Sequence, residues 1–580
     1  MSELQKLKAA ASLSQFAQLL RVKTAMLSFQ LYKKPKTTLY RKFEIAKRQG
    51  GVREILAPES DLKLLQHRLS ELLQTCTVEV NAIHGHVETA NLQGIAHGFK
   101  PFHSIMTNGR AHVARRFVFN VDLRDFFGSI NFGRVRGFFI SDENYKLHPD
   151  VATLIAQIAC HENKLPQGSP CSPVISNLIG HKLDLALVRL AAGTGSTYTR
   201  YADDLTFSTN KRLFPNRLAV QTNENQWKPG HGLKRVVERS GFSFNEAKTR
   251  MQYRDSRQEV TGLTVNRKVN VPATYRYTVR AMVDSVFKTG DFFLVRNRLD
   301  TAGIITVEQH PGKRKQLLGM LSYIDQVDRF NKNLNENNGL EPADTHGRIE
   351  LFRRFLYFDM FYALDQPLIV CEGKTDNIYL KSAMQSLAAL YPSLVAPGPP
   401  AKQLIRFLKY ADQRTAEITQ LTGGVGGICN LLRNYHRDLT LKFKAPKPKH
   451  PVIVLIDNDN GASSIYEAIA GITKQKKPAG MADFIHVTGN LYVVPTPFGP
   501  KKSRTAIEDF FDAQTLAHRL NGKTFNREKK IDESTEYGKT AFALNVVAKN
   551  AGTIDFGGFK PVLDRVGAVL IDYAGKLKLP

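Results

Sequence analysis

The sequence predicts a mixed α+β fold for the first part of the chain and an α/β fold with a parallel sheet for the second. Three observations support this prediction. A short apolar strand, Phe117 to Val121, ends at Asp122, and a strand–turn–strand pattern spans 197–208. Beyond residue 366 strands and helices alternate, which is typical of a parallel sheet with helical crossovers.

The elements of the first part follow from residue spacing. Residues 1–115 are predicted to be mainly helical with basic faces, because apolar residues between Leu62 and Leu73 recur close to helical spacing. The polar, Asn-rich stretch 331–346 predicts an exposed loop or linker. Further helices are predicted at 150–160, 172–192, 275–289 and 315–332, and a strand at 260–271.

In the second part, two apolar strands each lead directly into acidic residues. The strand ending at Cys371 is followed by Glu372, and the strand from Val452 to Ile456 is followed by Asp457. Open parallel sheets place their functional sites at the carboxyl ends of strands. The fold of the basic region 516–580 is not predicted from the pattern.

Composition narrows the class of partner. The 580 residues carry a net charge of +28, divided into +19 over residues 1–300 and +9 over 301–580. We expect nucleic acid rather than a membrane surface as the partner of such a basic chain, although solubility alone is an alternative. The hydrophobic content of 42% is enough to bury cores.

Other classes are disfavoured by what the sequence lacks. Five scattered cysteines without C-x-x-C spacing argue against a zinc site and a disulfide framework, and fit a reducing compartment. No run of about 18 apolar residues predicts a membrane-spanning helix, and we expect no membrane partner. No secretory signal is visible at the N-terminus.

Three carboxylates form the first candidate site. Asp122 ends a strand, and Asp203 and Asp204 lie in a turn between two strands. If one sheet brings these strands together, the cluster suits two Mg²⁺ ions that activate an attacking hydroxyl and steady a leaving pyrophosphate. For an isolated Asp-Asp pair, the alternative is a solvated hairpin tip.

The residues around these carboxylates resemble reverse transcriptases. Tyr201-Ala202-Asp203-Asp204 resembles their active-site turn, residues 120–127 (NVDLRDFF) their first catalytic motif, and 165–173 (LPQGSPCSP) the positioning motif between them. The three matches occur in the family's order. Later and earlier segments, around Gly241-Phe242, Val260-Thr261-Gly262, Asn108 to His112 and Gly51 to Pro58, extend the resemblance over about 20–330. We identify this part as a retron-type reverse transcriptase, a right-hand polymerase with fingers, palm and thumb.

The resemblance implies roles for single residues. Asp122, Asp203 and Asp204 would be the catalytic metal ligands. Arg53 would meet the triphosphate, Phe127 the sugar, Gln167 and Gly168 the nucleotide, and Lys248 the leaving pyrophosphate. Ordinary core packing is the alternative for Phe127, and a surface cation for Arg53 and Lys248. Asn108 and His112 would contact RNA, or else satisfy buried polar groups. The remaining implied RNA-binding residues are Val260, Thr261 and Gly262.

The same resemblance implies the substrate. Retron enzymes copy part of a cognate structured non-coding RNA with dNTPs, and prime on a 2′-OH within that RNA. The product is a branched RNA–DNA, multicopy single-stranded DNA, that stays bound to the enzyme. The family implies a bacterial, cytoplasmic protein. The sequence leaves open whether the chain forms a homo-oligomer.

A second acidic set resembles the Toprim fold of topoisomerases, primases and overcoming-lysogenization-defect nucleases. Glu372 to Asp376 (EGKTD), Asp457-Asn458-Asp459 and Glu508 carry the resemblance over about 366–515. Glu372, Asp457 and Asp459 would hold Mg²⁺ in a second two-metal site, and Asp376 and Glu508 would be catalytic. A loop or helix cap is the alternative for Asp-x-Asp. For Lys539 a surface position is preferred to a helper role.

A Mg²⁺-dependent nuclease is the preferred activity of the second part. Too few residues remain for the tyrosine-bearing domain of a topoisomerase, and the cysteines do not suit the zinc module of a primase. The hypothesis is therefore a retron reverse transcriptase fused to a Toprim effector nuclease that acts on a nucleic-acid target in anti-phage defence. The alternative is a non-catalytic second part that binds nucleic acid or a partner. A group II intron-type or an untemplated abortive-infection polymerase is disfavoured.

The predicted division of the chain follows these resemblances. The boundaries are N-terminal helices and fingers at 1–115, palm at 116–270, thumb at 271–330, a linker at 331–365, an α/β Toprim domain with a parallel sheet at 366–515, and a basic C-terminal region at 516–580.

Overall fold

The computed structural model divides the chain into two compact units. Unit 1 comprises residues 1–276 and 326–343, and unit 2 comprises 277–325 and 344–580. The structure describes residues 1–46, 52–84, 94–223, 226–299, 305–337, 345–396, 398, 401–410, 412–528 and 530–578. The predicted motif residue Gly51 lies outside the described residues, as do positions 338–344 of the predicted linker.

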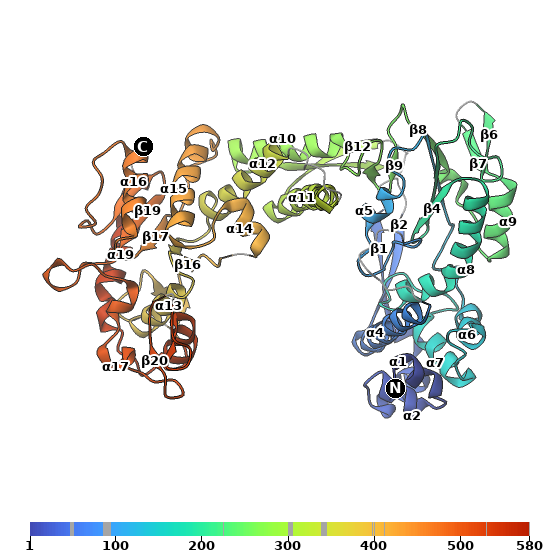
Figure 1. The fold of residues 1–580 in the computed structure, drawn as a ribbon, viewed down its shortest axis with the longest axis horizontal. Coiled ribbons are helices and arrows are strands. Elements are labelled where there is room, and N and C mark those ends of the chain that lie inside the picture. Colours follow the sequence, from blue (N-terminus) through green and yellow to red (C-terminus); the bar gives the residue numbers. More distant parts are fainter. Residues whose placement is uncertain are drawn as a thin grey trace. The chain divides into compact units, whose positions relative to one another are not determined.

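A four-stranded antiparallel sheet forms the centre of unit 1. Its strand order is β4-β5-β3-β8. Strands β4 and β8 of this sheet are labelled in Figure 1. Every residue of β3 except Phe117 and Asn120 is buried, because helices cover the sheet. The strands are β3 (Phe117–Asp122), β4 (Thr197–Tyr201), β5 (Asp204–Thr209) and β8 (Arg250–Tyr253).

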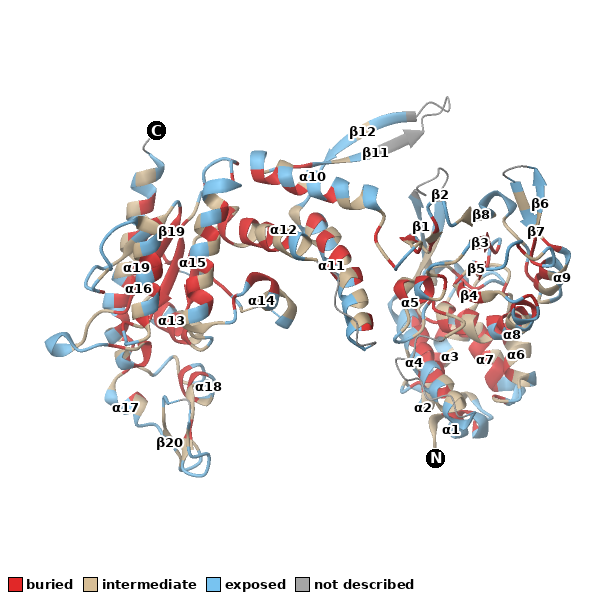
Figure 2. Ribbon diagram, turned by 45° about the horizontal axis from the view of Figure 1, so that its top comes forward, coloured by how far each residue is buried: buried red, intermediate tan, exposed pale blue. Residues whose placement is uncertain are grey.

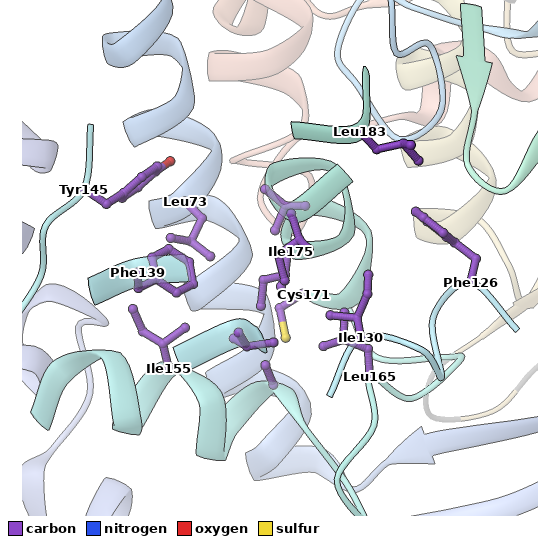
Figure 3. Close-up of a cluster of buried hydrophobic side chains, with 14 of the residues drawn as sticks. Leu73, Phe126, Ile130, Phe139, Tyr145, Ile155, Leu165, Cys171, Ile175 and Leu183 are labelled. Atoms are coloured by element: carbon purple, nitrogen blue, oxygen red, sulfur yellow. The ribbon is translucent and has the colours of Figure 1, made fainter. Parts of the chain in front are cut away.

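Long helices pack beside this sheet around one apolar core. The buried side chains Leu73, Phe139, Ile155 and Ile175 come from four different helices and meet in this core (Figure 3). Each large apolar side chain that is fully buried contributes about 1.5–3 kcal/mol relative to an exposed one. The helices are α4 (Ser60–Ile83), α6 (Phe132–Ser141), α7 (Pro149–Ala159) and α8 (Ser172–Gly193).

Smaller elements complete unit 1. Three hairpins pair antiparallel strands, and short helices precede the sheet or follow it. The hairpins are β1 (Tyr40–Ala46) with β2 (Val52–Pro58), β6 (Ala219–Asn223) with β7 (Gln226–Pro229), and β9 (Glu259–Val260) with β10 (Leu263–Thr264). The helices are α1 (Glu3–Ala9), α2 (Leu13–Leu19), α3 (Thr24–Ser28), α5 (Ile105–Arg110) and α9 (His231–Arg239).

Unit 2 contains a five-stranded sheet of order β16-β13-β17-β19-β18. The first four strands run parallel, and β18 is an antiparallel edge strand. Both faces of β13 and β17 are buried, which explains their continuous apolar sequences (Figure 2). The strands are β13 (Leu368–Cys371), β16 (Arg406–Phe407), β17 (Val452–Ile456), β18 (Ile485–Thr488) and β19 (Leu491–Pro495).

The helices of unit 2 include several that lie outside the central α/β region. Helices α10 and α11 each belong partly to unit 1 and partly to unit 2. They flank the hairpin of β11 (Phe293–Leu299) and β12 (Ile305–Pro311). The helices are α10 (Ala273–Thr289), α11 (Arg314–Asn337), α12 (His346–Tyr357), α13 (Asp376–Ser386), α14 (Gln413–Thr419), α15 (Gly424–Leu441), α16 (Ala462–Thr473), α17 (Ala513–Leu516), α18 (Lys539–Ala541) and α19 (Lys560–Leu577).

The stretch 331–365, expected to be a linker, contains the end of α11 and the whole of α12. Phe352 and Phe355 give α12 a buried side, and Arg353 lies 2.8 Å from Asp438 of α15 in a buried ion pair. The Asn-rich composition therefore marks the polar end of a helix, and apolar residues further along anchor the next helix to unit 2.

The C-terminal region, whose fold the pattern left open, belongs to the core of unit 2. Val562, Leu563, Val566 and Val569 of α19 are fully buried against side chains of β13, β17 and β19. The region is thus one cover of the parallel sheet. Among the described residues, no helix is long and apolar enough to cross a membrane.

We predict that Leu563→Ala lowers the free energy of unfolding of unit 2 by about 2–5 kcal/mol, because it leaves a cavity beneath the sheet. Ile571→Ala on the same helix is the matched control, since Ile571 is 76% exposed; it should change stability by no more than about 0.5 kcal/mol. Denaturant unfolding followed by circular dichroism measures both. Equal effects would contradict the placement of α19.

Candidate functional site

The sheet of unit 1 brings the three predicted carboxylates to one end. Asp122 ends β3 and stands opposite Asp204, the first residue of β5. The β4–β5 turn consists of Ala202 and Asp203, and Ala202 adopts a φ of 56°. A backbone hydrogen bond of 2.9 Å from Leu123 N–H to the Asp203 carbonyl ties the turn to β3. One sheet therefore brings together the strand that ends at Asp122 and the strands on either side of Asp203, as the predicted site requires.

Repulsion between these carboxylates is partly offset by nearby cations. Asp122 is 4% exposed, and its Oδ2 lies 2.8 Å from the Nζ of Lys248. Loss of water on burial and the negative charge of Asp122 raise the pKa of Asp203, while the positive charges of Lys248 and Arg53 lower it. Asp204 is exposed as a residue, but loss of water around its carboxyl and repulsion by Asp203 and Asp122 raise its pKa to about 6.

The donor chemistry of this set fits a divalent cation. Carboxylate oxygens are the hard ligands that Mg²⁺ prefers, and a cation would relieve the repulsion that raises both pKa values. Among the described residues, however, no three His, Cys, Asp or Glu side chains form a group that could hold a metal ion. Asp122 is instead engaged by Lys248 and, at 3.2 Å, by Asn245.

A buried ion pair behind the turn was missed in the sequence. Arg200, the residue before Tyr201, is fully buried and donates to both carboxylate oxygens of Asp184 on α8, at 2.8 and 2.7 Å. It also donates to the Ala202 carbonyl at 3.1 Å. Arg200 therefore fixes the acidic turn to a core helix. An Arg one residue before the end of a strand is a weak signal, because only the fold reveals its partner.

The segment before α5 also supports the turn. Residues 95–97 run beside β4, and His97 N–H donates to the Arg200 carbonyl at 2.8 Å. A Cβ atom on Gly98 would lie 2.6 Å from the backbone nitrogen of Ala202. Gly98 is thus required by the close approach of the two backbones.

The predicted nucleotide-binding residues lie on several elements of unit 1. The Gln167 carbonyl accepts a 2.8 Å hydrogen bond from Leu56 N–H of β2. Gly168 has a φ of 119°, and a Cβ there would lie 2.7 Å from the Leu56 carbonyl oxygen. The close approach at Gly168 is therefore to strand β2. Arg53 is exposed on the same strand, and Phe127 is partly buried, with its ring centroid 6.0 Å from that of Phe99.

The predicted RNA-contacting residues divide into two groups. Asn108 and His112 are fully buried, and both hydrogen-bond to the Thr199 hydroxyl, at 2.6 and 2.8 Å. Burial lowers the pKa of His112 to about 3. Their contacts are therefore to protein, matching the buried-polar alternative. Val260 is buried as well, whereas Thr261 and Gly262 form a hairpin turn with φ values of 48° and 82°.

In unit 2, the predicted acidic residues gather at the carboxyl ends of β13 and β17. Asp457 follows β17 and accepts a 2.8 Å hydrogen bond from Ile507 N–H. Asp376 opens α13 and accepts one of 2.8 Å from Gly373 N–H. Glu508 is 1% exposed in the turn that follows Ile507. The parallel sheet thus joins residues from three distant segments.

These acids lie close enough to repel one another. Burial, followed by the charges of Asp376, Glu508 and Glu372, raises the pKa of Asp457 to about 8. Burial and the charge of Asp459 raise the pKa of Glu372 to about 7. The Oε2 atoms of Glu372 and Glu508 are buried without a hydrogen-bond partner. Carboxylate oxygens are ligands that Mg²⁺ prefers, although among the described residues of this unit, too, no three His, Cys, Asp or Glu side chains form a group that could hold a metal ion.

Two neighbours of this set have clear local roles. Asp459 is exposed, and its Oδ1 accepts hydrogen bonds of 2.7 Å from Gly461 N–H and 3.3 Å from Ala462 N–H in the loop that leads into α16. This local role corresponds to the loop or helix-cap alternative foreseen for Asp-x-Asp. Lys539, for which a surface position was preferred, lies 2.8 Å from the buried Glu508 carboxylate. Its side chain keeps 37% of its exposure, so Lys539 lies at the surface and also pairs with a buried carboxylate, because the C-terminal region folds back over the sheet.

Comparison with known proteins identifies relatives of the first part. Residues 45–266 match the family model "Reverse transcriptase (RNA-dependent DNA polymerase)". The Retron Mx65 reverse transcriptase of Myxococcus xanthus is 36% identical over 276 residues, covering 45% of this chain and 59% of that protein. The Retron Ec86 reverse transcriptase of Escherichia coli is 31% identical over 240 residues, covering 41% of this chain and 68% of that protein.

The curated relatives are matched over only part of their own lengths. The chain spans 59% and 47% of the lengths of the Mx65 and Mx162 relatives. A solved structure of apo telomerase from Candida tropicalis covers 41% of this chain and 56% of that chain at 13% identity and a TM-score of 0.26. A TM-score this low carries no weight for either fold or function.

We predict that Arg200→Met destabilises unit 1 by about 3–5 kcal/mol, because it leaves Asp184 buried without its cation. Adding Asp184→Leu should restore part of the loss, since an apolar pair replaces an isolated charge. The single tryptophan, Trp227, lies in unit 1, so its fluorescence during denaturant unfolding measures the effect. A double variant no more stable than Arg200→Met would contradict the ion-pair role.

We predict a pH dependence of stability from Glu372 and Asp457. Their folded-state pKa values of about 7 and 8 exceed the unfolded values near 4, so the folded state binds more protons between these limits. In a chelating buffer the melting temperature of unit 2 should therefore fall as pH rises from 5 to 8. Asp457→Asn should reduce this fall, whereas the exposed control Glu533→Gln should leave it unchanged.

Proposed function

Because this chain belongs to the retron reverse transcriptase family, we propose that its first part is an RNA-directed DNA polymerase. It copies a cognate structured non-coding RNA with dNTPs and yields a branched RNA–DNA, multicopy single-stranded DNA. The observation that carries this proposal is the register of Asp122 opposite Asp204, with Asp203 in the adjoining turn. This register brings the three carboxylates to the same end of the sheet.

The surrounding residues have separable tasks in nucleotide addition. Divalent cations bound by the three carboxylates would activate the attacking hydroxyl and stabilise the leaving pyrophosphate. Lys248, held beside Asp122, supplies a positive charge near those phosphates, and Arg53 supplies another from β2. Phe127 presents a ring where a ribose 2′-OH would clash. Arg200 acts through the turn and is a positioning residue.

We predict that Asp203→Asn combined with Asp204→Asn abolishes DNA synthesis, because metal affinity requires the carboxylate charge. Loss of about 10³-fold or more in rate is expected for removal of such electrostatic stabilisation. Primer extension on a poly(rA)–oligo(dT) template measures it. Asp125→Asn, three residues after Asp122, is the matched control and should retain activity. Extension by the double variant would refute the assignment.

We infer that the second part is a Mg²⁺-dependent Toprim nuclease. Glu372, Asp376, Asp457 and Glu508 gather at one end of a parallel sheet, and their mutual repulsion raises the pKa of Asp457. Clustering of acidic side chains is costly to stability and is typical of a metal-dependent site. Lys539, paired with Glu508, provides a cation beside these carboxylates. A nucleic-acid backbone is the proposed target.

A non-catalytic second part is the competing proposal, and one variant separates the two. Asp457→Asn should abolish cleavage of mixed RNA and DNA substrates by protein stripped of bound nucleic acid and supplied with Mg²⁺. Glu533→Gln, which is exposed, should cleave like the unaltered chain. If the unaltered chain cuts neither substrate, the second part is a binding module.

The two activities together suggest anti-phage defence in bacteria. In this proposal the branched RNA–DNA made by the first part restrains the nuclease of the second until infection disturbs it. Cells that carry the Asp203→Asn and Asp204→Asn changes would lack the product. Protection from phage that survives those changes would contradict the proposed coupling.

A further inference from the structure

A cationic loop follows β19 and leads to Glu508. We define it as residues 496–505, the substrate loop. Its two ends meet, because the hydroxyls of Thr496 and Thr505 lie 2.9 Å apart. Thr496 N–H also donates to the Ile456 carbonyl at 2.9 Å, which fixes the loop to the end of β17. The loop is therefore anchored at the carboxyl end of β17, where the acidic residues gather.

Contacts place this loop against the acidic residues. Asn458 N–H donates to the Thr505 carbonyl at 2.9 Å. Arg504 Nη1 donates to the backbone carbonyl of Asp459 at 2.8 Å. Two residues after the loop, Ile507 N–H donates to the Asp457 carboxylate. The substrate loop thus wraps around Asp457-Asn458-Asp459.

Two lysines at its tip adopt an unfavourable backbone conformation. Lys501 and Lys502 have φ values of 55° and 61°, in the left-handed region that non-glycine residues rarely occupy. Both are exposed, and neither pairs with a carboxylate among the described residues. Lys502 is three residues from Thr505, so their Cα atoms are separated by at most about 11 Å.

We propose that Lys501 and Lys502 bind the phosphate backbone of the nucleic acid that the second part cleaves, an inference that rests on the proposed nuclease. The acids of the site repel a phosphodiester, so a substrate needs fixed positive charge close to them. Backbone strain persists where the surrounding structure enforces it, and such residues cluster at functional sites. Because both ends of the loop are fixed to the segment that carries Asp457, the two lysines at its tip lie within a few residues of the acidic set.

Glycine substitution separates charge from folding. Lys501→Gly with Lys502→Gly removes both charges and suits the left-handed backbone, so the loop should keep its shape. The matched control is Lys474→Gly, because Lys474 is exposed with a φ of 58° but lies at the far end of α16. That helix begins beside Asp459, so its 12 residues put Lys474 about 18 Å away from the acidic set.

The first measurement is cleavage kinetics of a 30-base-pair DNA hairpin and its RNA counterpart by the full chain with Mg²⁺. The glycine pair should raise KM at least tenfold with little change in kcat. It should also lower the salt dependence of log kcat/KM by about 1.8, since each phosphate contact contributes about 0.9. Lys501→Arg with Lys502→Arg should restore both values, and Lys474→Gly should alter neither.

A second measurement does not depend on cleavage. Lys502→Cys and Lys474→Cys, each labelled with a photoactivatable crosslinker, are irradiated with the same hairpins in a chelating buffer. Four of the five native cysteines are buried, which limits background labelling. Crosslinking at 502 well above 474 supports the loop. Crosslinking without cleavage by the unaltered chain retains the loop and refutes only the nuclease. Equal yields at both positions, or an unchanged KM, overturn the proposal.

Discussion

Both units hold acidic side chains that repel one another at the ends of buried strands. This arrangement costs free energy, since each carboxylate loses water and gains a like-charged neighbour. It persists because the strands beneath are rigid and paired on both sides, as β3 and β17 are. Burial and this repulsion both raise the pKa values of Asp204 and Asp457.

The supporting contacts follow from this constraint. In unit 1, Arg200 donates a hydrogen bond to the Ala202 carbonyl of the acidic turn, and Lys248 forms an ion pair with Asp122. In unit 2, Lys539 pairs with Glu508 and the backbone of Ile507 holds Asp457. Each site therefore combines a rigid support with a small number of cations, and a bound divalent metal would complete the neutralisation.

The sequence predicted helices and strands well where apolar residues recur at regular spacing within a few residues of one another. The apolar strands before Asp122 and Asp457 and the helical spacing from Leu62 have buried counterparts in the structure. Prediction failed where the deciding contact is distant. The stretch predicted to be a linker contains α12, because the aromatic side chains of this helix pack within unit 2. Lys539 pairs with Glu508, because the C-terminal segment that carries it folds back onto the sheet.

By itself, the sequence determined the identity of the acidic residues, their order, and the strand or turn that carries each one. These properties depend on neighbours within a few residues. Only the tertiary structure decided which acids share a site. It also decided that Asn108 and His112 are buried against protein and that Asp184 pairs with Arg200. The reason is physical: burial and charge pairing depend on groups 16 to more than 100 residues apart, which no local pattern encodes.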